Sequence, residues 1–130
     1  MTLPRVRELA EFMWEESPGH FGGALSKILV SVANDNSSYL DFRMSSYAPK
    51  AHVHRHVHDA KEQVYLFVEG EGLLEVGDER TVVRPNSFVF LPPGVPHALY
   101  NTGTVNLVFY VITTPCTPDK AVLPANTVSA

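Results

Sequence analysis

The sequence has a single cysteine, no long apolar run and no cluster of basic residues, and each absence excludes a class of protein. Cys116 has no second cysteine to pair with, so an internal disulfide is excluded and a structural thiol is expected. No stretch approaches the roughly 18 apolar residues that a membrane span needs. The first 14 residues carry charges among their apolar positions, unlike the apolar core of a secretory signal. These features predict a cytoplasmic protein with no membrane partner.

The charge balance points away from nucleic acid. Lysine and arginine number 10, aspartate and glutamate 14, and the net charge is −4. We therefore expect neither nucleic acid nor an anionic membrane surface as a partner. The length of 130 residues fits one domain, and a hydrophobic fraction of 45% is enough to build a core without disulfide bonds or a structural metal. No repeat, low-complexity segment or internal linker is visible.

The N-terminal segment has the pattern of a short amphipathic helix. Thr2 can cap it, Pro4 suits the first turn, and four apolar residues follow at helical spacing: Val6, Leu9, Ala10 and Met13. The turn residues at 17–19 would end the helix. Residues 1–24 are therefore predicted to form a short N-terminal helix and a lead-in to the rest of the domain.

From residue 25 onward, short apolar runs alternate with turn residues about every ten positions, which is typical of a β-sandwich or barrel. The predicted strands are Leu25 to Ala33, Tyr39 to Tyr47, His52 to His58, Gln63 to Val68, Leu73 to Val76, Thr81 to Val83, Ser87 to Leu91, His97 to Tyr100 and Val105 to Thr113. The predicted fold is all-β, with a barrel over residues 25–114. Residues 115–130 carry three prolines and form a tail that packs outside or frays.

Four histidines alternate along one predicted strand: His52, His54, His56 and His58. Alternate residues of a strand share a face, so all four imidazoles are expected on one side, about 6 to 7 Å apart from neighbour to neighbour. Two imidazoles at positions i and i+2 can coordinate the same ion, so a His-x-His pair on a strand can supply two ligands to one metal site.

Gln63 and His97 are further ligand candidates. Gln63 opens a wholly apolar strand, and an unpaired buried amide costs roughly 1 to 3 kcal/mol. Either a metal ion or neighbouring backbone would satisfy it. His97 follows the rigid turn 92–96 and, taken alone, would be read as a surface or capping residue. The combination with the histidine strand is what makes it a candidate ligand.

Two motifs, in order and in register, resemble those of the cupin superfamily. The first family motif, Gly-x5-His-x-His-x(3,4)-Glu-x6-Gly, is matched in spacing by His56, His58, Gln63 and Gly70. The second, Gly-x5-Pro-x-Gly-x2-His-x3-Asn, is matched after its first position by Pro92, Gly94, His97 and Asn101. The resemblance implies a double-stranded β-helix, a jelly-roll-like barrel of about eight to ten strands. It also implies one divalent metal ion held by His56, His58, Gln63 and His97.

The chain departs from the family pattern at three positions. Lys50 and Asn86 stand where the motif glycines would be, which affects turn geometry. Gln63 replaces the usual glutamate, as it does in some cupins that process sugar acids, and adjacent Glu62 would face the opposite side. A neutral oxygen ligand leaves more net charge on the ion and lowers the expected affinity. The alternative pair His54 and His56 lies too far from Gln63, so His52 and His54 are read as substrate contacts or polar lining of the barrel mouth.

The predicted ligand set suits Zn, Fe, Ni, Mn or Cu and does not choose among them. We expect a small metalloenzyme acting on a small carboxylate- or hydroxyl-bearing metabolite, since a metal ion can polarise such a substrate or acidify a bound water. A non-catalytic cupin that binds or senses a small ligand is the alternative, and a metal-poor interaction module is a third. Nothing in the sequence separates the first two.

Two side chains near the expected ligands are candidates for a role in catalysis or substrate binding. Tyr65 should face inward and is the candidate catalytic residue, as a proton donor or acceptor; the other reading is an aromatic core residue. Arg43 alternates with apolar neighbours and is placed on the solvent face, unless a bulge turns it inward to meet a carboxylate. A homodimer is expected through sheet edges, with the N-terminal helix or the strand Leu25 to Ala33 contributing.

Overall fold

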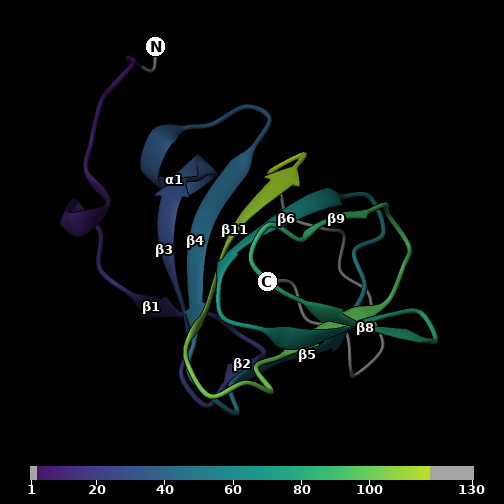
Figure 1. Ribbon diagram of the computed structural model, residues 1–130. Helices are drawn as coiled ribbons and strands as arrows, with labels where there is room; N and C mark the ends of the chain where they lie inside the picture. The colour runs from purple at the N-terminus through teal and green to yellow at the C-terminus, as the bar shows by residue number, and fades with distance from the viewer. Residues whose placement is uncertain (1–2, 118–130) are drawn as a thin grey trace.

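The strands pair into two antiparallel sheets that face each other in the computed structural model, which describes residues 3–117 (Figure 1). The larger sheet has the order β1 (Glu15–Glu16), β3 (Ala24–Val30), β4 (Asp41–Tyr47), β11 (Leu107–Thr114), β6 (Glu62–Glu69) and β9 (Phe88–Leu91). The smaller has the order β2 (His20–Phe21), β5 (His52–His56), β10 (His97–Tyr100), β7 (Gly72–Val76) and β8 (Glu79–Val83). The predicted double-stranded β-helix is confirmed.

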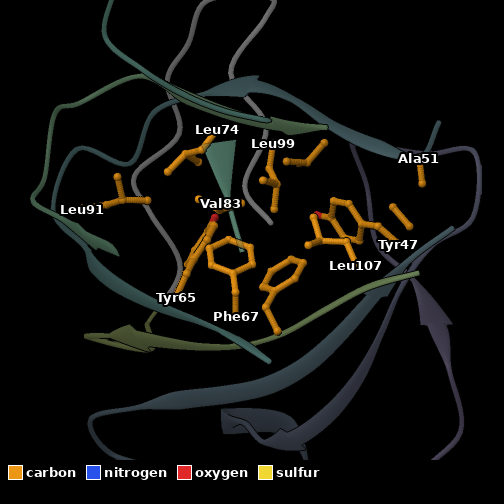
Figure 2. Packing of buried hydrophobic residues seen from close by; sticks show 12 residues of the cluster. Tyr47, Ala51, Tyr65, Phe67, Leu74, Val83, Leu91, Leu99 and Leu107 are labelled. Atoms are coloured by element: carbon orange, nitrogen blue, oxygen red, sulfur yellow. The ribbon is translucent and has the colours of Figure 1, made fainter. Parts of the chain in front are cut away.

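Alternation along the strands builds the core between the two sheets. On β6, Gln63, Tyr65 and Phe67 are buried while Val64 and Leu66 face outward. Figure 2 shows the inward side chains of the two sheets pointing toward one another. The largest fully buried side chains are Phe67, Phe109, Leu91, Leu99, Leu107, His97, Val53 and Val83. Each large apolar side chain buried in this way contributes roughly 1.5 to 3 kcal/mol.

The predicted N-terminal helix is wrong. Between residues 3 and 24 the only helical element is a single 3-10 turn, η1 (Leu9–Glu11), closed by the Glu8 amide donating to the Glu11 carboxylate at 2.7 Å. The apolar residues of the helical pattern meet no core, since Val6 is 97% exposed and Met13 79%. A short helix in water needs a packed apolar face, and this one has none.

The first core strand ends earlier than predicted. Strand β3 stops at Val30, and Ser31 then caps the one-turn helix α1 (Val32–Asp35) by accepting the Asn34 amide at 3.0 Å. The remaining boundaries agree with the predictions to within a few residues. Of the predicted tail, residues 118–130 lie outside the described part of the chain. Neither α1 nor η1 is long and apolar enough to cross a membrane, and no other helix forms within residues 3–117.

The two departures from the motif glycines keep the geometry that glycine would favour. Lys50 has φ 78° and Asn86 has φ 76°, both in the left-handed region. The turn at Lys50 is nevertheless held, because its amide donates to the Asn101 carbonyl at 3.0 Å. A left-handed conformation costs a residue with a Cβ roughly 1 to 2 kcal/mol, and asparagine tolerates it better than lysine.

Replacing Lys50 with glycine is therefore expected to raise the free energy of unfolding by about 0.5 to 1 kcal/mol. The relief of the strained φ exceeds the extra entropy that glycine gains in the unfolded chain. Urea denaturation of the parent and the variant measures the difference. Asn86→Gly should gain less, and Lys50→Ala should gain nothing, because alanine keeps the Cβ. A Lys50→Gly protein no more stable than the parent would contradict the strain argument.

The last residue of the second motif has a structural task. Asn101 is buried, and its Nδ2 donates to the Tyr47 carbonyl at 2.7 Å and to the Val105 carbonyl at 2.8 Å. Its Oδ1 accepts the Gly103 amide at 2.9 Å. Asn101 therefore fastens the loop before β11 to the end of β4, and it is not a ligand candidate.

Candidate metal centre

A β-bulge in β5 sets which histidines face the interior. Pairing with β10 matches Leu99 to Val53 and His97 to His56, so two steps on β10 correspond to three on β5. The extra residue reverses the alternation, as bulges do. Val53 and His56 are consequently both buried, although they are an odd number of residues apart.

The prediction that all four histidines of this strand share one face is therefore wrong. His54 is exposed and His52 is half-buried, both on the outer side of the smaller sheet. The Phe21 ring lies 4.5 Å from the His54 ring and 5.5 Å from the His52 ring, and the Tyr100 ring lies 5.8 Å from His52. Neither His52 nor His54 lines the barrel interior beside His56.

Three histidines meet inside the barrel, as predicted from the two motifs. His56, His58 and His97 each offer one ring nitrogen, and these atoms all lie within 4.8 Å of one another. The His97 ring centroid is 4.2 Å from that of His56 and 5.8 Å from that of His58. All three side chains are buried, so the cluster is shielded from bulk water.

Backbone carbonyls fix the tautomer of two of these rings. The Nδ1 of His56 lies 2.6 Å from the His54 carbonyl oxygen, and the Nδ1 of His97 lies 3.0 Å from that of Val95. A carbonyl oxygen only accepts, so Nδ1 carries the hydrogen and Nε2 carries the lone pair. Within residues 3–117, Nε2 of His56 and Nε2 of His97 are buried without a hydrogen-bond partner. Buried, unsatisfied lone pairs of this kind fit a metal ion.

The environment also keeps these imidazoles neutral. Burial lowers the pKa of His56 to about 3, with a further lowering from the neighbouring His97. Burial likewise lowers the pKa of His97 to about 4. Only the neutral ring can coordinate a metal, so both residues hold the form that coordination needs at neutral pH.

Gln63 lies on β6, in the sheet opposite to that of His56 and His97, and its amide already has protein partners. It is buried on β6, its Nε2 donates to Thr113 Oγ1 at 3.0 Å, and its Oε1 lies 3.5 Å from the Tyr65 hydroxyl. The bond to Thr113 orients the amide so that nitrogen points away from Tyr65 and oxygen points toward it. His97, by contrast, lies in the same sheet as His56 and directly opposite it in register.

Tyr65 is buried next to the cluster, with its ring 6.3 Å from the His97 ring and stacked 5.5 Å from Phe109. Burial raises the pKa of the Tyr65 hydroxyl well above its usual value. The phenol therefore stays protonated at neutral pH and suits a hydrogen-bond donor rather than a base.

A narrow polar cavity of about 30 Å³ lies beside Gln63 and Tyr65, and Arg43 and His20 also line it. Arg43 thus lies on the inner face of β4, in line with buried Ser45 and Tyr47, which corrects its predicted place on the solvent face. No bulge is needed, because the outer face of β4 is the more apolar one.

His20 also lines this cavity, and the sequence analysis assigned it no role. It is buried on β2, its Nδ1 donates to the Pro18 carbonyl at 3.0 Å, and burial lowers its pKa. Its Nε2 is thereby left as an acceptor beside the cavity. A lone histidine before two glycines carries no ligand spacing, so its sequence context offered no signal.

A family model described as a cupin domain matches residues 43–113, more than half of the chain. The chain belongs to the cupin family. The matched region contains β5, β6 and β10 and hence the three clustered histidines and Gln63.

Solved structures share this cupin fold. A predicted oxalate decarboxylase from Thermotoga maritima is 21% identical with a TM-score of 0.77, covering 85% of this chain and 99% of that one. The polyketide cyclase RemF from Streptomyces resistomycificus is 18% identical with a TM-score of 0.77, covering 95% and 89%. KdgF from Halomonas sp. is 18% identical with a TM-score of 0.68, covering 82% and 88%. At these identities the likeness extends to the fold alone.

A closer sequence relative is the uncharacterized protein MJ1618 of Methanocaldococcus jannaschii. It is 35% identical over 52 residues, which make up 40% of this cupin and 42% of the relative. The matched region of this cupin therefore spans less than half of the length of that relative.

Proposed function

We propose that this cupin binds one divalent transition-metal ion and acts as a small metalloenzyme on a small carboxylate- or hydroxyl-bearing metabolite. The observation that carries the proposal is the pair of buried, unpartnered Nε2 atoms of His56 and His97 within reach of His58. The proposed ligands are these three nitrogens and the carbonyl oxygen of Gln63. The set suits Zn, Fe, Ni, Mn or Cu.

A bound ion would supply a Lewis acid that polarises a substrate oxygen or acidifies a bound water. The chain's own groups would do the rest. Gln63 presents an oxygen whose direction is set by the bond from its Nε2 to Thr113. Tyr65, kept protonated by burial, donates a hydrogen bond to a substrate oxygen, and the His20 Nε2 accepts a proton on the other side of the cavity.

Elemental analysis of protein purified without chelator or histidine tag tests the proposal. We expect about one equivalent of a single transition metal per chain. Iron would favour oxygen chemistry, and zinc, nickel or manganese would favour isomerisation, lyase or hydrolytic chemistry. A protein that stays metal-free after loading with each ion would refute it. The non-catalytic alternative, a cupin that only binds a ligand, predicts the same metal content and no turnover of any ligand bound.

We also propose a homodimer, formed through the outer face of the larger sheet by a second copy of the chain. Strand pairing places apolar residues side by side across β9, β6, β11 and β4, in two rows: Phe90, Val64, Ile112 and Phe42; and Phe88, Leu66, Tyr110 and Met44. Monomers rarely expose so continuous an apolar patch. A two-fold axis would lay this face on its own copy. The edge of β3, predicted to contribute, is partly covered by β1.

Phe88→Asp is expected to convert the dimer into a monomer. Phe88 is 73% exposed in the single chain, so the substitution costs the monomer little while placing a charge in the apolar contact. Light scattering at micromolar concentration should give twice the chain mass for the parent and the chain mass for the variant. Val6→Asp, at a 97% exposed position of the lead-in, is the matched control and should stay dimeric. A monomeric parent would contradict the proposal.

A further inference from the structure

A cleft of about 420 Å³ opens next to the narrow cavity, and the two meet at Arg43 and Thr113, which line both. Lys61 lines the cleft as well, together with Ser17 and Asp41. Through these shared residues the cleft lies next to Gln63 and Tyr65, and the Tyr65 ring is 6.3 Å from the ring of the clustered His97. Its volume is in the range of sites for small metabolites.

Lys61 is the unusual group in this cleft. It is only 8% exposed, and it makes no hydrogen bond or ion pair with any residue from 3 to 117. It stands two residues before Gln63, on the inward-facing parity of β6. A buried ammonium group is costly unless a negative charge or an acceptor compensates it. No carboxylate within residues 3–117 forms an ion pair with Lys61, although Asp41, Glu15 and Glu16 line the same cleft, so the ammonium group is available to a bound anion.

Two more donors converge on the same place. The Nε and Nη2 of Arg43 bond the Asp41 carboxylate at 2.7 and 3.1 Å, and its Nη1 has only a long contact of 3.5 Å to Ser17 Oγ. Asp41 thus holds the guanidinium in place and leaves donors on Nη1 for a ligand. The Thr113 hydroxyl accepts from Gln63, so its own hydrogen remains to be donated into the cleft.

We propose that Lys61, Arg43 and Thr113 form a subsite for a single carboxylate of the substrate, with the substrate's hydroxyl groups directed toward Gln63, Tyr65 and the metal. The inference rests on the proposed function and names its substrate class as a small hydroxy acid. Glu15 and Glu16 also line the cleft and are exposed. These two carboxylates at the rim disfavour a second negative charge, so a monoanion with neutral hydroxyls fits better than a dianion.

Calorimetric titration of the zinc-loaded protein with gluconate tests the subsite, and sorbitol, the neutral polyol with the same number of carbons, is the comparison ligand. The parent should bind gluconate at least tenfold more tightly than sorbitol. Lys61→Met should weaken gluconate binding at least tenfold and leave sorbitol binding unchanged. Lys61→Arg should stay within about threefold of the parent, because it keeps the charge. Lys50→Met, which removes an exposed lysine outside the cleft, should bind gluconate like the parent.

The zinc content of every variant should equal that of the parent, because Lys61 is not a proposed ligand. Equal gluconate affinity for the parent and Lys61→Met, or equal affinity of the parent for gluconate and sorbitol, would overturn the subsite. If Lys61→Met does not fold, loss of the gluconate preference in Lys61→Gln decides in its place. A parent that holds no zinc would instead refute the metal proposal, and the same comparison is then made on the metal-free protein.

Discussion

Replacing His97 with alanine is expected to lower the affinity for metal at least 100-fold. His97 offers one of three histidine nitrogens in the cluster, and its Nε2 is aimed there by the bond from Nδ1 to the Val95 carbonyl. Losing a group that merely orients a ligand costs 10- to 100-fold in affinity, so losing the ligand itself should cost at least as much. Metal titration of the metal-free proteins, with elemental analysis of the same samples, measures the effect.

Two further variants separate the metal site from general damage to the fold. His52→Ala should bind metal like the parent, because His52 lies on the outer side of the sheet against Phe21 and Tyr100. Gln63→Glu should bind as tightly or more tightly, since a carboxylate adds charge attraction in the same place. If His52→Ala lost the metal while His58→Ala kept it, the assignment of His56 and His58 as ligands would be wrong.

The strand pattern of this cupin was readable from the sequence because turn residues interrupt apolar runs at regular distances. The spacing of two motifs predicted that His56, His58 and His97 belong to one site, and the three do lie together. The face of the sheet on which His52 and His54 lie was not predicted correctly. Histidine alternates with Val53 and Arg55 without interruption, so the local sequence gives no sign of a bulge. The bulge arises from the pairing of β5 with β10, which is a long-range property that the local pattern does not contain.

The errors at Arg43 and at the N-terminus have a common origin in exposed apolar residues. Phe42 and Met44 lie on the outer face of β4, where Phe42 stacks on Tyr110 at 5.7 Å, so the more apolar side of the strand is not the core side. At the N-terminus, Val6 and Met13 follow a helical period but have nothing to pack against. Periodicity indicates a buried face only when a partner surface exists, and the sequence does not show which surfaces have partners.

The metal-free protein is expected to lose stability as the pH falls below about 6.5, the ordinary imidazole value. Burial holds the pKa of His56 at about 3 and that of His97 at about 4. Below pH 6.5 the unfolded chain takes up protons at these two residues and the folded chain does not, so stability is full above that pH and is lost as the pH falls toward 4. One pKa unit corresponds to about 1.4 kcal/mol, so over the two pH units down to about pH 4.5 the two residues together should remove on the order of 5 kcal/mol.

Urea denaturation of the chelator-treated protein at several pH values measures this loss, and His97→Asn isolates the part that belongs to His97. The asparagine Nδ2 can donate to the Val95 carbonyl as the histidine Nδ1 does, and asparagine does not titrate. The slope of the free energy of unfolding against pH between about 6.5 and 4.5 should therefore be smaller by about 1.4 kcal/mol per pH unit in the variant. Carboxylates contribute equally to both proteins and cancel in the difference. An unchanged slope would mean that the buried His97 ring takes up its proton without unfolding the barrel, and that burial does not hold it in the neutral, metal-binding form.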